Sequence, residues 1–127
     1  MSAEIVSRLR LRVGEEDVHY GGGLVAGAYS MKLFGDLATE IAILTDGHEG
    51  LLRAYAGVEF LAPVAAGDFV EAEARMVSRG KTSRRIEFEV RKVIAGDPSG
   101  GANATVLNPP IVVTRAVGTT VIPQESH

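Results

Sequence analysis

The chain has 127 residues and no cysteine, which excludes disulfide bonds, thiolate nucleophiles and cysteine metal sites. This length predicts a single domain over residues 1–127, and 46% hydrophobic with 23% charged residues is typical of a soluble globular protein. A net charge of −3 offers no overall attraction to nucleic acid or to an anionic membrane. Since no signal peptide or membrane-length apolar run is seen, we expect a cytoplasmic protein without a membrane partner.

The first predicted element is a strand over residues 5–13. Alternate positions from Ile5 to Val13 are apolar apart from Ser7, and arginines occupy the positions between them. This period of two predicts a strand with one face in the core and the other in water.

A long helix is predicted from about Leu24 to Thr45, with Asp46-Gly47 as its stop signal. Apolar residues cover most of its circumference, so we expect it to be buried on several sides. A narrow polar stripe remains, made of Tyr29, Lys32, Asp36, Thr39 and Glu40.

The rest of the chain predicts strands at residues 51–61, 69–78, 83–94 and 111–122. The turn-rich stretch 96–108 reads as a mobile excursion that Pro109-Pro110 ends. The order of strand, helix and four strands predicts an α+β fold in which a five-stranded antiparallel sheet wraps one central helix. The exposed edges of such a sheet favour dimers.

The first candidate for chemistry is the pair Asp36 and Glu40. At spacing i, i+4 they lie on one face of the predicted helix, one turn apart. Burial and mutual repulsion would raise the pKa of at least one carboxyl group toward the range of a general acid or base. The alternative is structural, because Lys32 is placed to form an ion pair with Asp36.

A glycine-rich segment precedes the helix and contains His19, Tyr20, Gly21, Gly22 and Gly23. Glycines permit positive φ and a close approach of ligand to backbone. Amide hydrogens at a helix N-terminus favour a negative oxygen, such as that of a thioester enolate. The two aromatic side chains are candidates to orient substrate or to carry a proton. An ordinary loop at a helix entry is the alternative interpretation.

A third candidate is the basic turn at residues 79–85, which holds Arg79, Gly80, Lys81, Ser83 and Arg84. Such a local cluster can hold phosphate groups despite the negative net charge. A solvated hairpin tip is the alternative. No metal site is expected, because the three histidines lack the spacing of metal ligands.

The order of elements, the glycine-rich helix entry and the helix carboxylates together resemble the hotdog-fold superfamily of acyl-CoA thioesterases and dehydratases. Several segments are more closely similar to the 3-aminobutyryl-CoA and β-alanyl-CoA ammonia-lyases. They are His19-Tyr20-Gly21-Gly22, residues 33–40 (LFGDLATE), residues 58–64 (VEFLAPV), Ala66-Gly67-Asp68-Phe69 and Ala116-Val117-Gly118-Thr119.

The resemblance implies reversible loss of ammonia from a 3-aminoacyl-CoA to give a 2-enoyl-CoA. Glu40 or Asp36 would remove the α-proton, and the other carboxylate would bind the substrate ammonium. Amide hydrogens near Gly22 and Gly23 would hold the thioester oxygen. No metal or redox cofactor is implied, since coenzyme A is part of the substrate.

By the same resemblance, the chain is a homo-oligomer built on dimers, and coenzyme A lies along the subunit boundary. Its phosphates would meet Arg79, Lys81 and Arg84, with backbone access at Gly80 and Ser83. Two alternatives stay open. One is a thioesterase in which a helix carboxylate activates water, and the other is an acyl-CoA-binding module without catalysis. The paired acids favour catalysis.

Overall fold

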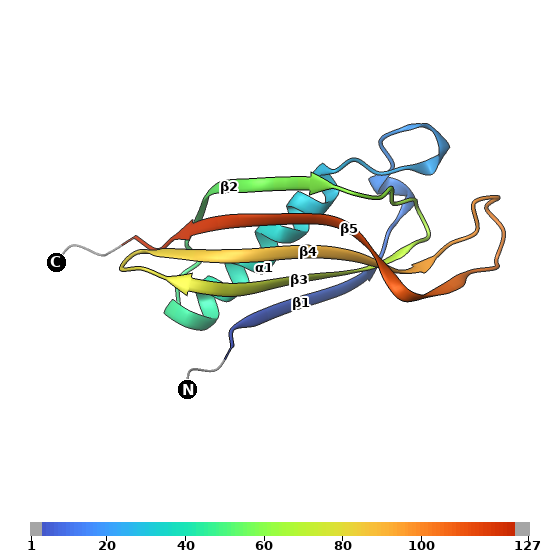
Figure 1. Cartoon of the computed structure of the whole chain (residues 1–127). Coiled ribbons are helices and arrows are strands. Elements are labelled where there is room, and N and C mark those ends of the chain that lie inside the picture. The colour runs from blue at the N-terminus through green and yellow to red at the C-terminus, as the bar shows by residue number, and fades with distance from the viewer. Residues whose placement is uncertain (1–3, 124–127) are drawn as a thin grey trace.

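The computed structural model describes residues 4–123. Its elements are β1 (Val6–Arg12), η1 (Glu15–Asp17), η2 (Gly21–Gly23), α1 (Ala28–Asp46), β2 (Leu51–Phe60), β3 (Phe69–Arg79), β4 (Ser83–Ala95) and β5 (Thr105–Val121). The strands form one antiparallel sheet in the order β1-β3-β4-β5-β2, and α1 lies across one face of it (Figure 1). The predicted α+β arrangement of one long helix and five antiparallel strands is confirmed.

The core lies between α1 and the inner face of the sheet. Phe34 and Ile41 of the helix are fully buried, and the Phe34 ring stacks on that of Phe88 with the centroids 4.8 Å apart. On β1, Ser7 is buried and Leu11 is half-buried whereas the three arginines are exposed, as the alternation predicted, but Leu9 is 36% exposed.

The helix is covered on one side only, so the prediction that it is buried on several sides is wrong for a single chain. Ile43 and Leu44 are 48% and 65% exposed, and Asp36 also faces away from the sheet. The physical reason is that a single sheet can cover only the helix face that contacts it. The apolar residues on the opposite side of α1 therefore remain open to water or to another subunit.

The helix begins at Ala28 and not at Leu24. Leu24 and Val25 instead have extended backbones that form isolated β-bridges with Ala65 and Val18. The carbonyl of Leu24 accepts hydrogen bonds from the amides of His19 and Tyr20. These tertiary backbone bonds hold the segment outside the helix, although its apolar residues fit the helical pattern.

The last strand also differs from the prediction, because β5 begins at Thr105, within the stretch expected to be a loop. Thr105 and Val106 pair with Ala95 and Ile94, and Pro109-Pro110 lies inside the strand. The prolines fall at an irregularity of the β4–β5 pairing, where a missing amide hydrogen costs no ladder bond. Only residues 96–104 connect the two strands.

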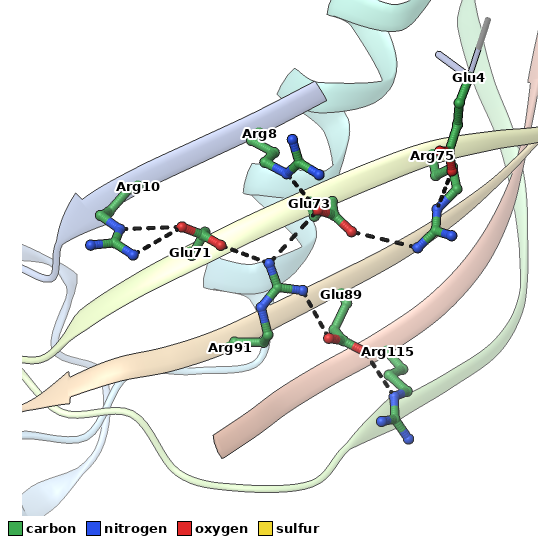
Figure 2. Close-up of polar contacts among 9 residues, drawn as sticks. All are labelled: Glu4, Arg8, Arg10, Glu71, Glu73, Arg75, Glu89, Arg91 and Arg115. Atoms are coloured by element: carbon green, nitrogen blue, oxygen red, sulfur yellow. Dashed lines mark hydrogen bonds and ion pairs between the residues drawn. The ribbon is translucent and has the colours of Figure 1, made fainter. Parts of the chain in front are cut away.

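The outer face of the sheet carries interleaved arginines and glutamates (Figure 2). Arg91 bridges Glu71 at 2.8 Å and Glu89 at 2.9 Å, and Arg10 of β1 also binds Glu71. The hydrogen bond from Arg91, reinforced by that from Arg10, lowers the pKa of Glu71. The charges of this network largely neutralise one another on the outer face, whereas the pocket described next lies beside the start of α1.

Candidate active site

A mainly apolar pocket lies where α1 begins and β2 ends. It has a volume of about 680 Å³ and is lined by Tyr20, residues 24–28, Ser30, residues 60–64, Val113 and Thr114. None of these side chains is charged. The hydroxyls of Ser30 and Thr114 bond to each other at 2.9 Å and are buried, so they tie α1 to β5. The chemistry of the walls suits an apolar acyl group.

The first turn of α1 supplies hydrogen-bond donors to this pocket. Gly27 precedes the helix, and the amide of Tyr29 donates to the carbonyl of Ala26. The amide hydrogen of Ala28 has no acceptor among residues 4–123. Free amides at a helix N-terminus favour a negative oxygen, so this turn is the better candidate to hold a thioester oxygen.

Sequence reasoning missed Ala28 because it started the helix too early. The amides of Gly22 and Gly23, predicted for this role, lie before the helix and beside a separate hollow near Lys92. Both glycines do adopt the positive φ of 75° that their residue type allows. The signal for the true start was Gly27, because glycine is among the residue types accepted at the N-cap.

Of the predicted segment His19–Gly23, only Tyr20 lines the pocket. It is 56% exposed, and the His19 ring packs edge-on against it with the centroids 4.7 Å apart. Gly21 is exposed, and a side chain added there would contact nothing. The segment therefore borders the pocket mouth rather than its floor.

The two predicted acids lie outside the pocket of their own chain. The Asp36 side chain is 61% exposed and forms an ion pair with Lys32 at 3.5 Å, as the structural alternative expected. The Glu40 carboxylate accepts a hydrogen bond from the buried Ser7 hydroxyl on β1. The expected burial of the acidic pair is wrong for a single chain, because Asp36 faces away from the sheet and Glu40 contacts only its edge strand β1.

Tyr29, from the same polar stripe, has a buried hydroxyl without a hydrogen-bond partner in the part of the chain that the structure describes. Burial, reinforced by the charges of Asp17 and Glu16, raises the pKa of Tyr29 to about 12. At neutral pH this phenol is therefore protonated and is no candidate for a general base.

The basic turn lies at the opposite end of the sheet, beside the end of α1 (Figure 1). The Arg84 side chain is only 5% exposed and binds Asp46 at 3.0 Å, and it also donates to the carbonyls of Gly80 and Ser83. Its donors are largely used within the chain, which leaves few for a phosphate. Arg79 also pairs with Asp46, but it is half exposed.

Lys81 is exposed at the tip of the turn, where the amide of Gly80 donates to the carbonyl of Ser83. Arg79, Lys81 and Arg85 are thus the residues of this turn whose charges reach water. Within one chain the structure does not bring them to the pocket. Either a second subunit unites the two regions or the turn has no part in binding.

The bond between Asp46 and Arg84 makes a prediction about acid stability. Hydrogen bonds from Thr45 first, and then from Arg84, lower the pKa of Asp46. Asp46→Ala leaves the buried guanidinium without its carboxylate, so we expect a loss of about 3 kcal/mol in the free energy of unfolding at pH 7.

A carboxyl group with a lowered folded-state pKa stabilises the fold above its ordinary pKa, and this contribution is lost as pH falls through the lowered value. The difference between wild type and Asp46→Ala should therefore be full at neutral pH and shrink below about pH 4. Urea denaturation at several pH values measures it. A difference that stays constant down to pH 2 would contradict the ionic role of Asp46.

Neither a metal site nor a membrane span is found in the part of the chain that the structure describes. No three histidine, aspartate or glutamate side chains among residues 4–123 group as metal ligands would. Within the same residues, no helix combines the length and the apolar character that crossing a membrane requires.

Comparison with known proteins identifies the family. The sequence model described as "Thioesterase superfamily" matches residues 22–95, which include the pocket walls from Leu24 to Val64 and all of α1. The chain belongs to the thioesterase superfamily. The hotdog fold expected from the sequence is thereby confirmed.

Two ammonia lyases are similar to this superfamily member over nearly its whole length. The 3-aminobutyryl-CoA ammonia lyase of Acetoanaerobium sticklandii is 52% identical over 122 residues, which are 95% of this chain and 97% of the relative. The solved β-alanyl-CoA:ammonia lyase of Clostridium propionicum is 32% identical and superposes with a TM-score of 0.90, covering 98% of this chain and 94% of that one. The predicted resemblance to these lyases is confirmed.

A more distant member shows the common fold. The hexameric thioesterase from Yersinia pestis is 23% identical, with a TM-score of 0.71 over 97% of this chain and 88% of its own. At this identity the likeness supports the architecture alone. The roles of individual residues therefore depend on the geometry of this chain.

Proposed function

We propose that this chain is a carbon–nitrogen lyase that reversibly eliminates ammonia from a 3-aminoacyl-CoA of the 3-aminobutyryl type. The observation that carries the proposal is the 52% identity to a 3-aminobutyryl-CoA ammonia lyase over 95% of the chain, which extends through both the pocket and the acidic helix. The apolar pocket with a helix N-terminus at its wall is a suitable place for a short acyl thioester.

The reaction needs two contributions from the protein, a base and a hydrogen-bond donor to the enolate oxygen. A base takes the proton from the α-carbon, and the thioester oxygen takes up the negative charge of the resulting enolate. The free amides at the start of α1 would stabilise that oxygen. The enolate electrons then form the double bond as the C–N bond of the substrate ammonium breaks, and the nitrogen leaves with its electron pair as neutral ammonia. These steps need no metal or redox cofactor, so the absence of one remains part of the proposal.

The base must come from outside the pocket's own chain, because no charged side chain lines the pocket. We infer that a second copy supplies it by pairing along β2. β2 is an edge strand of the sheet, and both Leu51 and Phe60 at its ends are more than half exposed. Two copies joined antiparallel along β2 would cover this edge and form a symmetric dimer.

Such a dimer would bring the pocket of one subunit close to the helix carboxylates and the basic turn of the other. The pocket adjoins the end of β2, and the end of α1 leads through residues 47–50 into the start of β2. An antiparallel pair of β2 strands therefore places each pocket near the middle and second half of the other subunit's helix and near its basic turn. Arg79 and Lys81 of the partner subunit would then be available to the phosphates of coenzyme A.

Asp36 is the better candidate for the base. Glu40 is bonded to Ser7 on β1, and β1 forms the sheet edge opposite to β2. Its carboxylate thus points away from the edge at which the partner would pair. Asp36 has only an exposed ion pair with Lys32, which a substrate can displace at little cost. We therefore assign Glu40 a structural role. The cytoplasmic location of the protein remains a prediction from its sequence.

The decisive test is incubation of the purified protein with crotonyl-CoA and ammonium. We expect the absorbance of the enoyl thioester to fall in proportion to enzyme, without release of free thiol. Omission of ammonium should abolish the change. Thiol release without amination would instead establish a thioesterase, and acyl-CoA binding with neither reaction would establish a binding module.

A further inference from the structure

A glycine and an aromatic ring are in unusually close contact at the mouth of the pocket. Gly27 has φ −56°, which any residue adopts, so its backbone conformation does not require glycine. A Cβ atom there would lie 2.4 Å from Cε1 of Phe60 and 2.8 Å from Cδ1 and Cζ. Such distances are far below carbon–carbon contact, so the ring lies directly on the space that a side chain at Gly27 would fill.

This contact fixes one wall of the pocket. Phe60 is the last residue of β2 and pairs with Thr114, so its backbone is anchored in the sheet. Its side chain is nonetheless not buried, because the residue is 58% exposed. The ring is therefore positioned mainly by its seat on Gly27, next to the first turn of α1, where the thioester oxygen would be held.

We propose that Phe60 sets the length of acyl chain that the pocket accepts, and that Gly27 is the positioning residue that gives the ring its place. The inferred ligands are short-chain acyl-CoA thioesters, and longer chains would collide with the ring. The link to amination rests on the proposed lyase function, whereas the selection of acyl length by binding does not.

The first test measures binding of butyryl-CoA and octanoyl-CoA, two saturated thioesters that cannot be aminated, by calorimetry. A wall that excludes or admits a few methylenes changes selectivity by about tenfold or more. We expect Phe60→Ala to shift the ratio of the two dissociation constants toward octanoyl-CoA by at least about tenfold. A ratio within about twofold of wild type, in a folded variant, would overturn the role of Phe60.

The second test is a double-mutant cycle for Gly27. Gly27→Ala must displace the ring, so we expect it to change the same ratio by about fivefold or more. In the Phe60→Ala background the added methyl group meets no ring, and the effect of Gly27→Ala should fall below about twofold. An equal effect in both backgrounds would overturn the positioning role.

Amination rates with crotonyl-CoA and 2-octenoyl-CoA then test whether Phe60 also selects the acyl length during turnover. If wild type does not aminate crotonyl-CoA, the lyase proposal fails, while the binding ratios still decide the role of Phe60. The matched control is Val106→Ala, since Val106 is also an exposed apolar residue but lies outside the pocket. Val106→Ala should leave the ratio of the two dissociation constants unchanged. A shift like that of Phe60→Ala would contradict the proposal that Phe60 acts locally as a wall of the pocket.

Discussion

Asp36→Asn should lower kcat for the amination of crotonyl-CoA by about a thousandfold, the range expected when a general base is lost. Asparagine has nearly the same shape as aspartate but cannot accept the α-proton. The Asp36 side chain is 61% exposed and makes no contact with the core, so we expect the free energy of unfolding to change by less than about 0.5 kcal/mol. Steady-state kinetics and urea denaturation measure the two effects.

Two neighbouring variants give the controls. Lys32→Gln removes the ion pair but keeps the carboxylate, so its kcat should stay within about threefold of wild type. Glu40→Gln changes an acid that bonds to Ser7, and we expect a loss below about tenfold. A wild-type kcat for Asp36→Asn would refute the role of Asp36 as the base. A decrease in kcat of more than about tenfold for Glu40→Gln would indicate that Glu40 is the base.

Mixed dimers of two inactive variants should recover about one half of the wild-type activity. One parent is Asp36→Asn, and the other is Ala28→Trp, which fills the mouth of the pocket at an exposed helix position. If each site combines the pocket of one subunit with the carboxylate of the other, a mixed dimer has one site with both parts intact and one site with both parts altered. Co-expression with two affinity tags yields the mixed species.

The recovery has a clear control and a clear contrary result. Asp36→Asn subunits carrying both tags should remain inactive after the same purification, and light scattering should confirm that each parent still assembles. Mixed oligomers that are as inactive as their parents would show that Asp36 does not serve a neighbouring pocket. The proposed pairing along β2 would then lose its functional support.

Local patterns in the sequence predicted the parts of this fold that depend on periodicity. The alternation around Ser7 on β1 is confirmed because each residue of a strand takes the opposite face from its neighbour. The end of the helix at Asp46-Gly47 also agrees, since Gly47 takes the left-handed φ of 64° that closes a helix. Such features arise from the chain itself and require no distant partner.

The boundaries that failed depend on distant contacts. Leu24 fits a helical pattern, yet its backbone pairs with Ala65, a residue that no local signal connects to it. In the same way, the local sequence around Thr105 predicts a loop, but Thr105 pairs with Ala95 of β4 in the sheet. In both cases a tertiary hydrogen bond outweighs a local preference of comparable size.

By itself, the sequence determined the class of fold, the family resemblance and the carboxylates that carry the proposed chemistry. Only the tertiary structure decided that the pocket opens at Ala28 and that Phe60 rests on Gly27. It also showed that Asp36 and the basic turn lie away from that pocket in one chain. The reason is physical, because sequence spacing fixes which face of an element a residue occupies, whereas the packing of elements determines which faces meet.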